Sequence, residues 1–590
     1  MPATLPKRPT DTTPGATKGA QGFTPEQKRY LAETLVEMNL HLALGGGDAK
    51  DNLGPETFWG TPVEDLCKEE RAKYETHVLD IWDDIVHHNN TNQMAEGITN
   101  FMFRHHGLFN VSPNMQGYMC RLRLPACKLR GDQLAGLGDI AEDIAGGYAH
   151  VTTRGNLQMR EIPPDRVLHL HAALYDLGLS SRASGADSAR NVTASPTAGF
   201  DRFEVMDLHR YAIDLNHRIA NTRDLNGIPR KFNFAFDNAG AISVVSDTND
   251  VGYLAVRVGD NDQGVEAGVY CRLLFGGITG HKDFARDTGF VCRPADTPEI
   301  SEAILRVFLA HGDRTNRKKA RFKYVLDRHG LDWVCEQVQA QLNAMGRGVR
   351  LIPLPRSADE PRARIRRRAH IGVHPQSQTG LHYIGVALRV GRLEADQLRG
   401  LGRIARDLGA NDVRLTVWQN LILSGIPEAS VPEEVKAIRG LGLDVDATAF
   451  AAGAVACTGR WGCKLANAYT KQDAAAMIDH LQARFELDQP INIHLTGCPN
   501  SCAQHYIGDL GLVGTTAEDG SEGYDLYVGG GCDDQQGLAR FLCGPIASRD
   551  VCAVSEKIVG NYLDARDPGE AFLNFTRRHD EEQLKSVLLA

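Results

Sequence analysis

The sequence predicts an α/β fold of the α+β type, in which a pseudo-twofold pair of half-domain repeats is combined with further domains. With 590 residues, the chain is long enough for three or four domains and a sizeable buried core. The strongest observation is an internal repeat: ten of the fifteen residues from Leu129 to Asp143 are identical to those from Leu393 to Asp407, 264 positions later. Two copies so far apart do not form a solenoid array and instead indicate two related half-domains.

The composition narrows the class of protein. Hydrophobic residues make up 42% of the chain and charged residues 24%, as in an ordinary globular protein, and the net charge of -9 argues against a nucleic-acid partner. We find no run of eighteen apolar residues that would span a membrane, and residues 1–22 lack the apolar stretch of a secretory signal. We therefore expect a cytoplasmic protein with no membrane partner. An odd number of cysteines, 13, argues against a disulfide framework and leaves metal ligation open.

The patterns along the chain predict the elements in order. Residues 1–22 are expected to form a disordered leader. Residues 23–110 should form an N-terminal helical region, because Leu31, Leu35 and Met38 follow Thr24 at helical spacing. The first half-domain repeat, residues 111–180, is expected to contain a strand, a helix and a second strand near 118–124, 132–144 and 150–159. The second half-domain repeat, residues 376–435, should have the same order.

Polar residues line one face of the predicted strands in the first half-domain only. Alternate residues of a strand share a face; those that share one here are Arg121 and Arg123 on the first strand, and Thr152, Arg154, Asn156 and Gln158 on the second. The second half-domain has Gly385 and Ala387 at the positions of Arg121 and Arg123, and Trp418 and Ile422 at those of Arg154 and Gln158. A solvated sheet face would explain one such strand. In the second half-domain both neighbouring strands lack the polar face, and this joint difference favours a polyanion site in the first half-domain.

Residues 181–345, between the half-domains, have a mixed pattern with one clear strand. Phe232, Phe234 and Phe236 alternate with Lys231 and Asn233, so the aromatic rings form one face, expected in the core, and the polar side chains the other. A lysine on a strand is ordinarily solvated. Residues 346–375 are expected to be a linker, with 355–368, rich in Pro and Arg, as an exposed connection. Residues 436–590 would form the last domain.

Four cysteines have the spacing of metal ligands. Five residues separate Cys457 from Cys463, and three separate Cys498 from Cys502. Because a proline follows Cys498, we expect the second pair one turn apart on a helix. Gly459, Gly462 and Gly497 would let the backbone approach a bulky inorganic group. Four thiolates favour zinc or an iron-sulfur cluster. The five-residue gap favours iron-sulfur, because structural zinc uses tighter pairs; incidental cysteines remain a third explanation.

The motif from Thr496 to Cys502, Thr-Gly-Cys-Pro-Asn-x-Cys, preceded by Cys-x5-Cys, resembles the signature of the siroheme-dependent nitrite and sulfite reductases. The similarity extends from about Phe101 to Gly531 and includes the repeat. It implies the three-domain architecture of these enzymes, with residues 181–345 as the siroheme- and substrate-binding domain and residues 436–590 as the 4Fe-4S cluster and siroheme domain. The four cysteines would bind the cluster, with Cys502 as the bridge to siroheme.

The resemblance also implies roles for individual residues. Those that would hold the siroheme carboxylates and the cofactor pair are Thr152, Arg154, Asn156, Gln158, Arg230, Asn500 and Cys502. Those that would form the substrate pocket are Arg121, Arg190, Lys231 and Asn233, with Lys231 as the candidate proton donor and the arginines as electrostatic clamps. Related sulfite reductases have a second lysine where Asn233 stands. Nitrite carries one charge and sulfite up to two, so a pocket with one cation fewer suits nitrite.

The expected activity is therefore the six-electron reduction of nitrite to ammonium, with sulfite reduction as the alternative. A corrin-ring-modifying oxygenase and a zinc-stabilised, non-catalytic binding protein also remain open. No Gly-x-Gly-x-x-Gly fingerprint or flavin segment is found, so electrons should come from a separate protein, a ferredoxin. Two basic clusters are candidate docking sites: one consists of Arg314, Arg317, Lys318, Lys319, Arg321 and Lys323, and the other extends from Arg362 to Arg368.

Overall fold

The computed structural model describes residues 56–111, 116–259, 263–359, 365–368 and 370–590. The predicted leader and the predicted helix start at Thr24 lie outside these residues. The first described elements are a short hairpin, β1 (Thr57–Phe58) and β2 (Thr61–Pro62), and three helices, α2 (Lys68–Glu75), α3 (Trp82–Asn90) and α4 (Gly97–Phe103). In this part of the chain, no helix is long and apolar enough to cross a membrane.

The two half-domains have the same order of elements. The first consists of β4 (Tyr118–Arg121), β5 (Lys128–Arg130), α5 (Gly131–Asp143), β6 (Tyr148–Val151) and β7 (Leu157–Ile162). The second consists of β15 (Leu381–Val386), β16 (Arg392–Glu394), α11 (Ala395–Asp407), β17 (Asp412–Leu415) and β18 (Leu421–Pro427). Helix α6 (Val167–Asp176) follows the first copy, and helix α12 (Val431–Gly440) follows the second. The predicted pseudo-twofold pair is confirmed.

The half-domains exchange a short strand. One five-stranded sheet has the order β16-β6-β7-β4-β3, with β3 at Leu108–Phe109, and the other has β14-β15-β18-β17-β5, with β14 at Gly372–Pro375. Strand β5 of the first copy thus pairs with β17 of the second, and β16 pairs with β6. Each half-domain completes the sheet of the other, so neither sheet is complete without the second copy.

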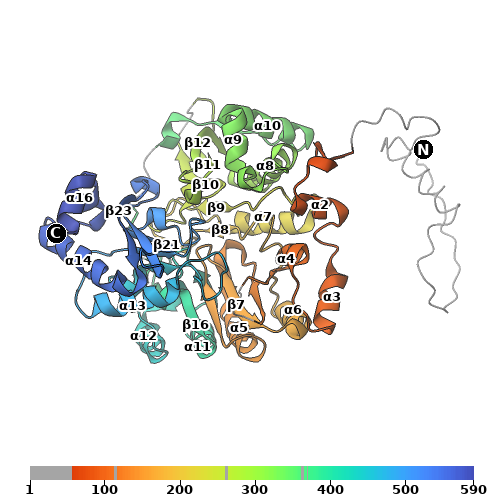
Figure 1. The fold of residues 1–590 in the computed structure, drawn as a ribbon. Helices are drawn as coiled ribbons and strands as arrows, with labels where there is room; N and C mark the ends of the chain where they lie inside the picture. Colours follow the sequence, from red (N-terminus) through yellow and green to blue (C-terminus); the bar gives the residue numbers. More distant parts are fainter. Residues whose placement is uncertain (1–55, 112–115, 260–262, 360–364, 369) are drawn as a thin grey trace, which may run out of the picture. The chain divides into compact units, whose positions relative to one another are not determined.

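The helices α5 and α11 pack side by side (Figure 1). Glycines shared by the repeat make this contact possible. A Cβ atom on Gly402 would lie 2.4 Å from the carbonyl oxygen of Gly131, and one on Gly138 would lie 2.7 Å from that of Ala395. Because real Cβ atoms do not approach so closely, a side chain at either position would separate the helices. The Gly-Leu-Gly identity between the copies therefore reflects helix packing.

The central region is built on a six-stranded sheet of order β13-β12-β11-β10-β9-β8. Its strands are β8 (Thr193–Ala194), β9 (Phe234–Asp237), β10 (Val251–Val258), β11 (Gly268–Phe275), β12 (Arg286–Cys292) and β13 (Ile352–Pro353). Its helices are α7 (His209–Asn221), α8 (Thr297–His311), α9 (Phe322–His329) and α10 (Leu331–Ala344), and Figure 1 shows the last three together beside the sheet. Phe232, Phe234 and Phe236 are fully buried in the core, as predicted.

The C-terminal region places the two cysteine pairs next to each other. Its sheet has the order β19-β20-β21-β22-β23, with strands at Ala454–Ala456, Ile493–Thr496, Leu510–Thr516, Glu522–Val528 and Arg540–Ala547. Helices α13 (Thr470–Gln482), α14 (Val551–Ala565), α15 (Phe572–Arg577) and α16 (Glu581–Leu588) complete it. β19 and β20 are parallel neighbours, so their carboxyl ends share one edge of the sheet. Cys457 directly follows β19, and Cys498 follows β20 by two residues.

The Pro- and Arg-rich connection is exposed at Arg356 and Arg366, as predicted, but two of its described arginines are bound inside the protein, which corrects the prediction for these two. Nη1 of Arg367 donates to Oδ1 of Asp509 at 2.8 Å. Nε of Arg368 donates to Oδ1 of Asn492 at 2.9 Å, and Arg368 is buried. The composition predicted exposure, but these arginines are held by residues more than a hundred positions away.

Candidate cofactor and substrate site

The loops after β19 and β20 carry the four predicted cysteine ligands. The backbone N–H of Gly497 donates to Sγ of Cys457 at 3.1 Å, which ties one loop to the other. The predicted helix at Cys498 is wrong: residues 497–503 form turns. Ser501 and Gln504 have φ values of 52° and 55°, in the left-handed region, and a right-handed helix cannot pass through them.

The four thiols lie close enough to influence one another electrostatically. Cys502 is solvent-exposed, yet the surrounding protein raises the pKa of its thiol to about 11; desolvation is the main cause, and the other three cysteines add to it. The pKa of Cys498 is raised in the same way, with Cys457 and Cys463 contributing. Hydrogen bonds from Asn500 oppose that shift, which places this predicted cofactor residue at the Cys498 thiol. Four mutually repelling thiolates require a shared positive charge.

The donor set, four cysteine thiols on two neighbouring loops, fits a 4Fe-4S cluster. Among the described residues, no group of three or more His, Cys, Asp or Glu side chains is close enough together to hold one metal ion. Structural zinc gathers its four ligands around one centre. A 4Fe-4S cluster is held by four separate cysteine thiolates, which therefore lie further apart.

The glycines of these loops allow close packing against neighbouring protein segments. A Cβ atom on Gly459 would lie 2.6 Å from the backbone nitrogen of Thr470, and one on Gly497 would lie 2.6 Å from Cβ of Ala466. One on Gly462 would meet Thr458 and the guanidinium of Arg160. A larger residue at these positions would displace the cysteine loops.

Three predicted cations surround Cys502. The Cys502 thiolate acts on Arg121, Arg154 and Lys231, in each case favouring the protonated cation. Desolvation, followed by repulsion from neighbouring cations, outweighs this effect. The pKa values of Arg121 and Arg154 fall to about 10, and that of Lys231 falls well below its ordinary range. The structure thus brings the predicted substrate and siroheme cations together at the predicted bridging cysteine.

These cations lack anionic partners. Within the described ranges, Arg121, Arg154, Arg190 and Lys231 form no ion pair with a carboxylate. Arg154 donates from Nη1 to Oδ1 of Asn249 at 3.1 Å, and Arg190 donates from Nη2 to the carbonyl of Ala186 at 2.6 Å, so both bind neutral acceptors. Nε of Arg190 is buried without a partner. Removing several cations from water without counter-charges is strongly unfavourable, so the site requires bound anions. The carboxylates of siroheme and a small oxyanion meet that requirement.

The predicted second strand of the first half-domain, which carries Thr152, Arg154 and Asn156, is interrupted by a turn. Strand β6 ends at Val151 and β7 begins at Leu157. Oγ1 of Thr152 accepts the backbone N–H groups of Arg154 and Asn156, both at 3.3 Å, and the Asn156 side chain is buried against the backbone of Leu122. Thr416 and Asn420 form the same turn in the second half-domain. Thr152 and Asn156 therefore build the turn, while Arg154 at its tip reaches the site.

The side-chain amide of Asn233 already has a hydrogen-bond partner. It is buried, and Nδ2 donates to Oδ2 of Asp250 at 3.0 Å, while Arg321 forms an ion pair with the same carboxylate at 2.8 Å. Oδ1 of Asn233 has no partner within the described residues. Lys231, by contrast, is half-buried, and its ammonium group forms no hydrogen bond with the described residues.

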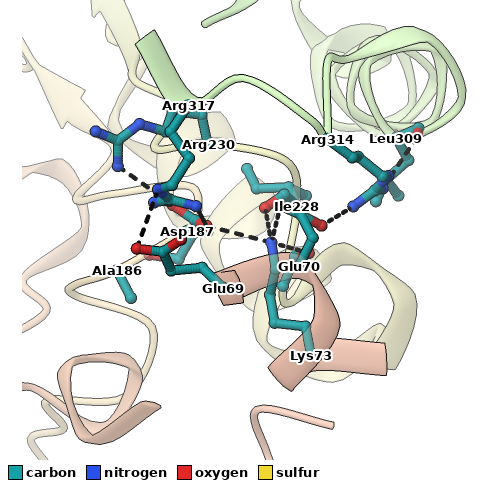
Figure 2. A network of polar contacts seen from close by, with 12 residues as sticks. Glu69, Glu70, Lys73, Ala186, Asp187, Ile228, Arg230, Leu309, Arg314 and Arg317 are labelled. Atoms are coloured by element: carbon teal, nitrogen blue, oxygen red, sulfur yellow. Dashed lines mark hydrogen bonds and ion pairs between the residues drawn. The ribbon is translucent and has the colours of Figure 1, made fainter. Parts of the chain in front are cut away.

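Arg230 and two arginines of the first basic cluster, Arg314 and Arg317, belong to an ionic network around the buried Asp187 and Glu70 (Figure 2). The carboxylate of Asp187 accepts hydrogen bonds from Nη1 and Nη2 of Arg317, both at 2.8 Å. It also forms ion pairs with Arg230 at 3.5 Å and with Lys73 at 3.2 Å. Arg314 binds Glu70 on α2. Figure 2 shows these chains converging from α2, the Asp187 loop and the 314–317 segment. Because Asp187 lies three residues before Arg190, the network holds the segment that carries Arg190 in place.

Most of the described cations in the two predicted docking clusters are paired inside the protein, and Lys318, Lys319 and Arg366 are exposed. In the first, Arg314, Arg317, Arg321 and Lys323 are bound by carboxylates of distant segments, and only Lys318 and Lys319 are exposed without a carboxylate partner in the described chain. In the second, residues 362–364 lie outside the described residues, and Arg367 and Arg368 are bound internally. These charges stabilise the fold.

Arg160 was missed by the sequence analysis. This buried arginine of β7 reaches the first cysteine loop, where Nη2 donates to Oγ1 of Thr458 at 2.6 Å, and it also binds Oε1 of Gln158 at 3.1 Å. Desolvation lowers its pKa, and the thiolates of Cys463 and Cys457 are among the groups that oppose the shift. Its position two residues after Gln158 on one strand face could have revealed it.

Comparison with known proteins agrees with this site. The family described as "Nitrite and sulphite reductase 4Fe-4S domain" matches residues 185–345 and 454–585. The family described as "Nitrite/Sulfite reductase ferredoxin-like half domain" matches residues 112–177 and 374–441, one segment in each half-domain.

Relatives match over nearly their full length. A ferredoxin–nitrite reductase of Synechococcus elongatus is 33% identical over 84% of this chain and 96% of its own. A ferredoxin sulfite reductase of Mycolicibacterium paratuberculosis is 28% identical over 79% of this chain and 83% of its own. The structure of the NirA protein of Mycobacterium tuberculosis superimposes with a TM-score of 0.80 at 26% identity, covering 88% of this chain and 97% of that one. The chain belongs to the nitrite and sulfite reductase family, whose members carry siroheme and a 4Fe-4S cluster.

Proposed function

We propose that this chain reduces nitrite to ammonium, a six-electron reaction, with electrons supplied by ferredoxin. The observation that carries the proposal is a group of cations without carboxylate partners. Arg121, Arg154 and Lys231 interact with the predicted bridging cysteine Cys502, and Arg190 interacts with Arg121 and Arg154. Relatives named ferredoxin–nitrite reductase are 33% and 34% identical to the chain, and those named sulfite reductase 28% and 30%. Sulfite reduction is the second candidate.

The chain's own residues define how the site would work. Cys457, Cys463, Cys498 and Cys502 would hold the cluster, and Arg154 would bind siroheme carboxylates. Siroheme supplies the iron at which the oxyanion is reduced. The cations Arg121, Arg190 and Lys231 would bind the anion and stabilise negative charge that develops as N–O bonds break.

Lys231 is the proposed proton donor of this pocket. Desolvation and repulsion from Arg321 and Arg154 lower the pKa of its ammonium well below the ordinary value, so the group can release a proton far more readily than an exposed lysine. Arg121 and Arg190 remain charged and act as fixed clamps, because a guanidinium seldom gives up a proton.

The preference for nitrite is supported by the state of Asn233. The residue contributes no charge, and its amide is held by Asp250. The pocket therefore presents three cations to the substrate rather than four, which suits an anion of one charge better than one of two. We also propose a cytoplasmic location. All thirteen cysteines are free, which is typical of a reducing compartment.

The experiment is a visible spectrum of the purified protein followed by steady-state reduction of nitrite with reduced methyl viologen. We expect siroheme absorption and ammonium as the product. A colourless, zinc-containing protein would contradict the proposal, and so would a coloured protein that does not reduce nitrite.

A further inference from the structure

The first cysteine loop reaches the protein surface directly after its second ligand. Lys464 is exposed, and the side chain of Leu465 is 59% exposed. Because two residues of chain span at most about 7 Å, Leu465 lies within that distance of Cys463, measured between Cα atoms. An exposed leucine beside a predicted cluster ligand is a natural contact point for a protein that must approach the cluster.

The two cysteine loops face different surroundings. The thiol of Cys502 acts on the half-buried cations Arg121, Arg154 and Lys231, so this side faces the proposed substrate site. Cys463 instead leads to the exposed Lys464 and Leu465. An electron that enters beside Cys463 would leave beside Cys502 without crossing the cationic pocket.

An open hollow of about 650 Å³ lies beside this surface and is lined by Arg460, Lys464, Asn467, Glu522 and Arg549, among others. Arg460 pairs with Glu522 at 2.6 Å and Arg549 with Asp519 at 2.7 Å. Both arginine side chains are more than half exposed, and exposed pairs contribute only about 0–1 kcal/mol, so these arginines can exchange partners readily. Lys464 has no carboxylate partner in the described part of the chain.

We propose that the Leu465 patch, which consists of Arg460, Lys464, Leu465 and Arg549, is the docking surface for the electron donor. The proposal rests on the proposed function and commits to one partner, an acidic ferredoxin-type protein. Protein interfaces combine exposed apolar side chains with polar and charged ones, as this patch does. The chain as a whole carries a net charge of -9 and repels an acidic partner at long range, so the partner needs local cations near the cluster. Each encounter would oxidise the donor by one electron, which enters the enzyme beside Cys463.

The test is a double variant, Lys464→Glu with Leu465→Ser, in the cofactor-loaded enzyme. Nitrite reduction is measured with reduced ferredoxin and separately with reduced methyl viologen, a small dye that needs no docking surface. We expect the KM for ferredoxin to rise at least tenfold, with dye-driven activity unchanged. The matched control is Lys318→Glu with Lys319→Glu, which reverses two exposed charges of the first basic cluster and should leave both activities unchanged.

A wild-type KM for ferredoxin in the Leu465-patch variant would overturn the proposal, and a raised KM in the control alone would move the dock to Lys318 and Lys319. If the patch variant also loses dye-driven activity, ferredoxin affinity is measured by calorimetry with the milder variant Leu465→Ala, and unchanged affinity refutes the patch. A wild type that reduces nitrite with dye but not with ferredoxin contradicts the choice of partner. A wild type inactive with dye contradicts the proposed function instead.

Discussion

Replacing Arg160 by glutamine is expected to lower the reduction potential of the 4Fe-4S cluster. Arg160 is buried, donates a hydrogen bond to Thr458 next to Cys457, and interacts electrostatically with Cys457 and Cys463. No carboxylate within the described residues forms an ion pair with it. Its positive charge therefore acts on the cluster ligands without a competing anion, and removing it makes an added electron less stable.

The magnitude follows from Coulomb's law. At an effective dielectric constant of about 20, unit charges about 8 Å apart interact by about 2 kcal/mol, and those about 4 Å apart by about 4 kcal/mol. For one electron, about 1.4 kcal/mol corresponds to about 59 mV. Because the guanidinium binds a residue adjacent to a ligand rather than the ligand itself, the larger separation applies, and we expect a decrease of roughly 50–100 mV.

The assay is a redox titration of the cluster followed by electron paramagnetic resonance. Arg392→Gln is the matched control, because Arg392 is partly exposed and already paired with Glu394 at 2.6 Å, so its loss should leave the potential unchanged. Arg160→Lys keeps the charge and should recover most of the wild-type potential. If Arg160→Gln binds its cofactors normally and its potential equals that of the wild type, Arg160 is not the counter-charge of the cluster.

Three further predictions concern the cofactors and the substrate. Cys502→Ser should abolish the cluster signal and also change the siroheme spectrum; a wild-type spectrum and iron content would rule out the bridge. Arg154→Ala should lower siroheme occupancy, measured by absorbance per chain, whereas Trp418→Phe at the equivalent position should not; equal losses would show that the wrong half-domain was chosen. Asn233→Lys should raise the sulfite-to-nitrite ratio of kcat/KM at least about tenfold, which needs only about 1.4 kcal/mol. An unchanged ratio would mean that Asn233 does not face the anion, and the main reason for choosing nitrite would be lost.

The pseudo-twofold architecture could be predicted because the repeated residues perform the same structural task in both copies. Gly138 and Gly402 lie where α5 and α11 pack against the opposite copy. The exchange of β5 and β16 could not be predicted, since strands of three residues carry no information about their partners. The predicted cysteine helix failed for a related reason: a proline permits a helix start, but left-handed residues further on prevent the helix.

The repeat also separates the residues that build the turn from the residue that differs between the copies. Thr152 and Asn156 are shared by both half-domains and build the same turn in each, so their identity reflects architecture. Arg154 differs from its counterpart Trp418, and it reaches the cationic site. Most of the described charges in the basic clusters are paired internally, which the sequence could not show. Sequence shows a charge without its partner, and the partner of Arg314 is Glu70, 244 positions away.

The central claim is that a cationic pocket with an uncharged Asn233 selects nitrite over sulfite. The most direct measurement is kcat/KM of the wild-type enzyme for both anions, with reduced methyl viologen as the donor so that partner docking has no influence. We predict a higher kcat/KM for nitrite, with ammonium as the product. A higher value for sulfite, with sulfide as the product, would contradict the assignment and make the chain a sulfite reductase.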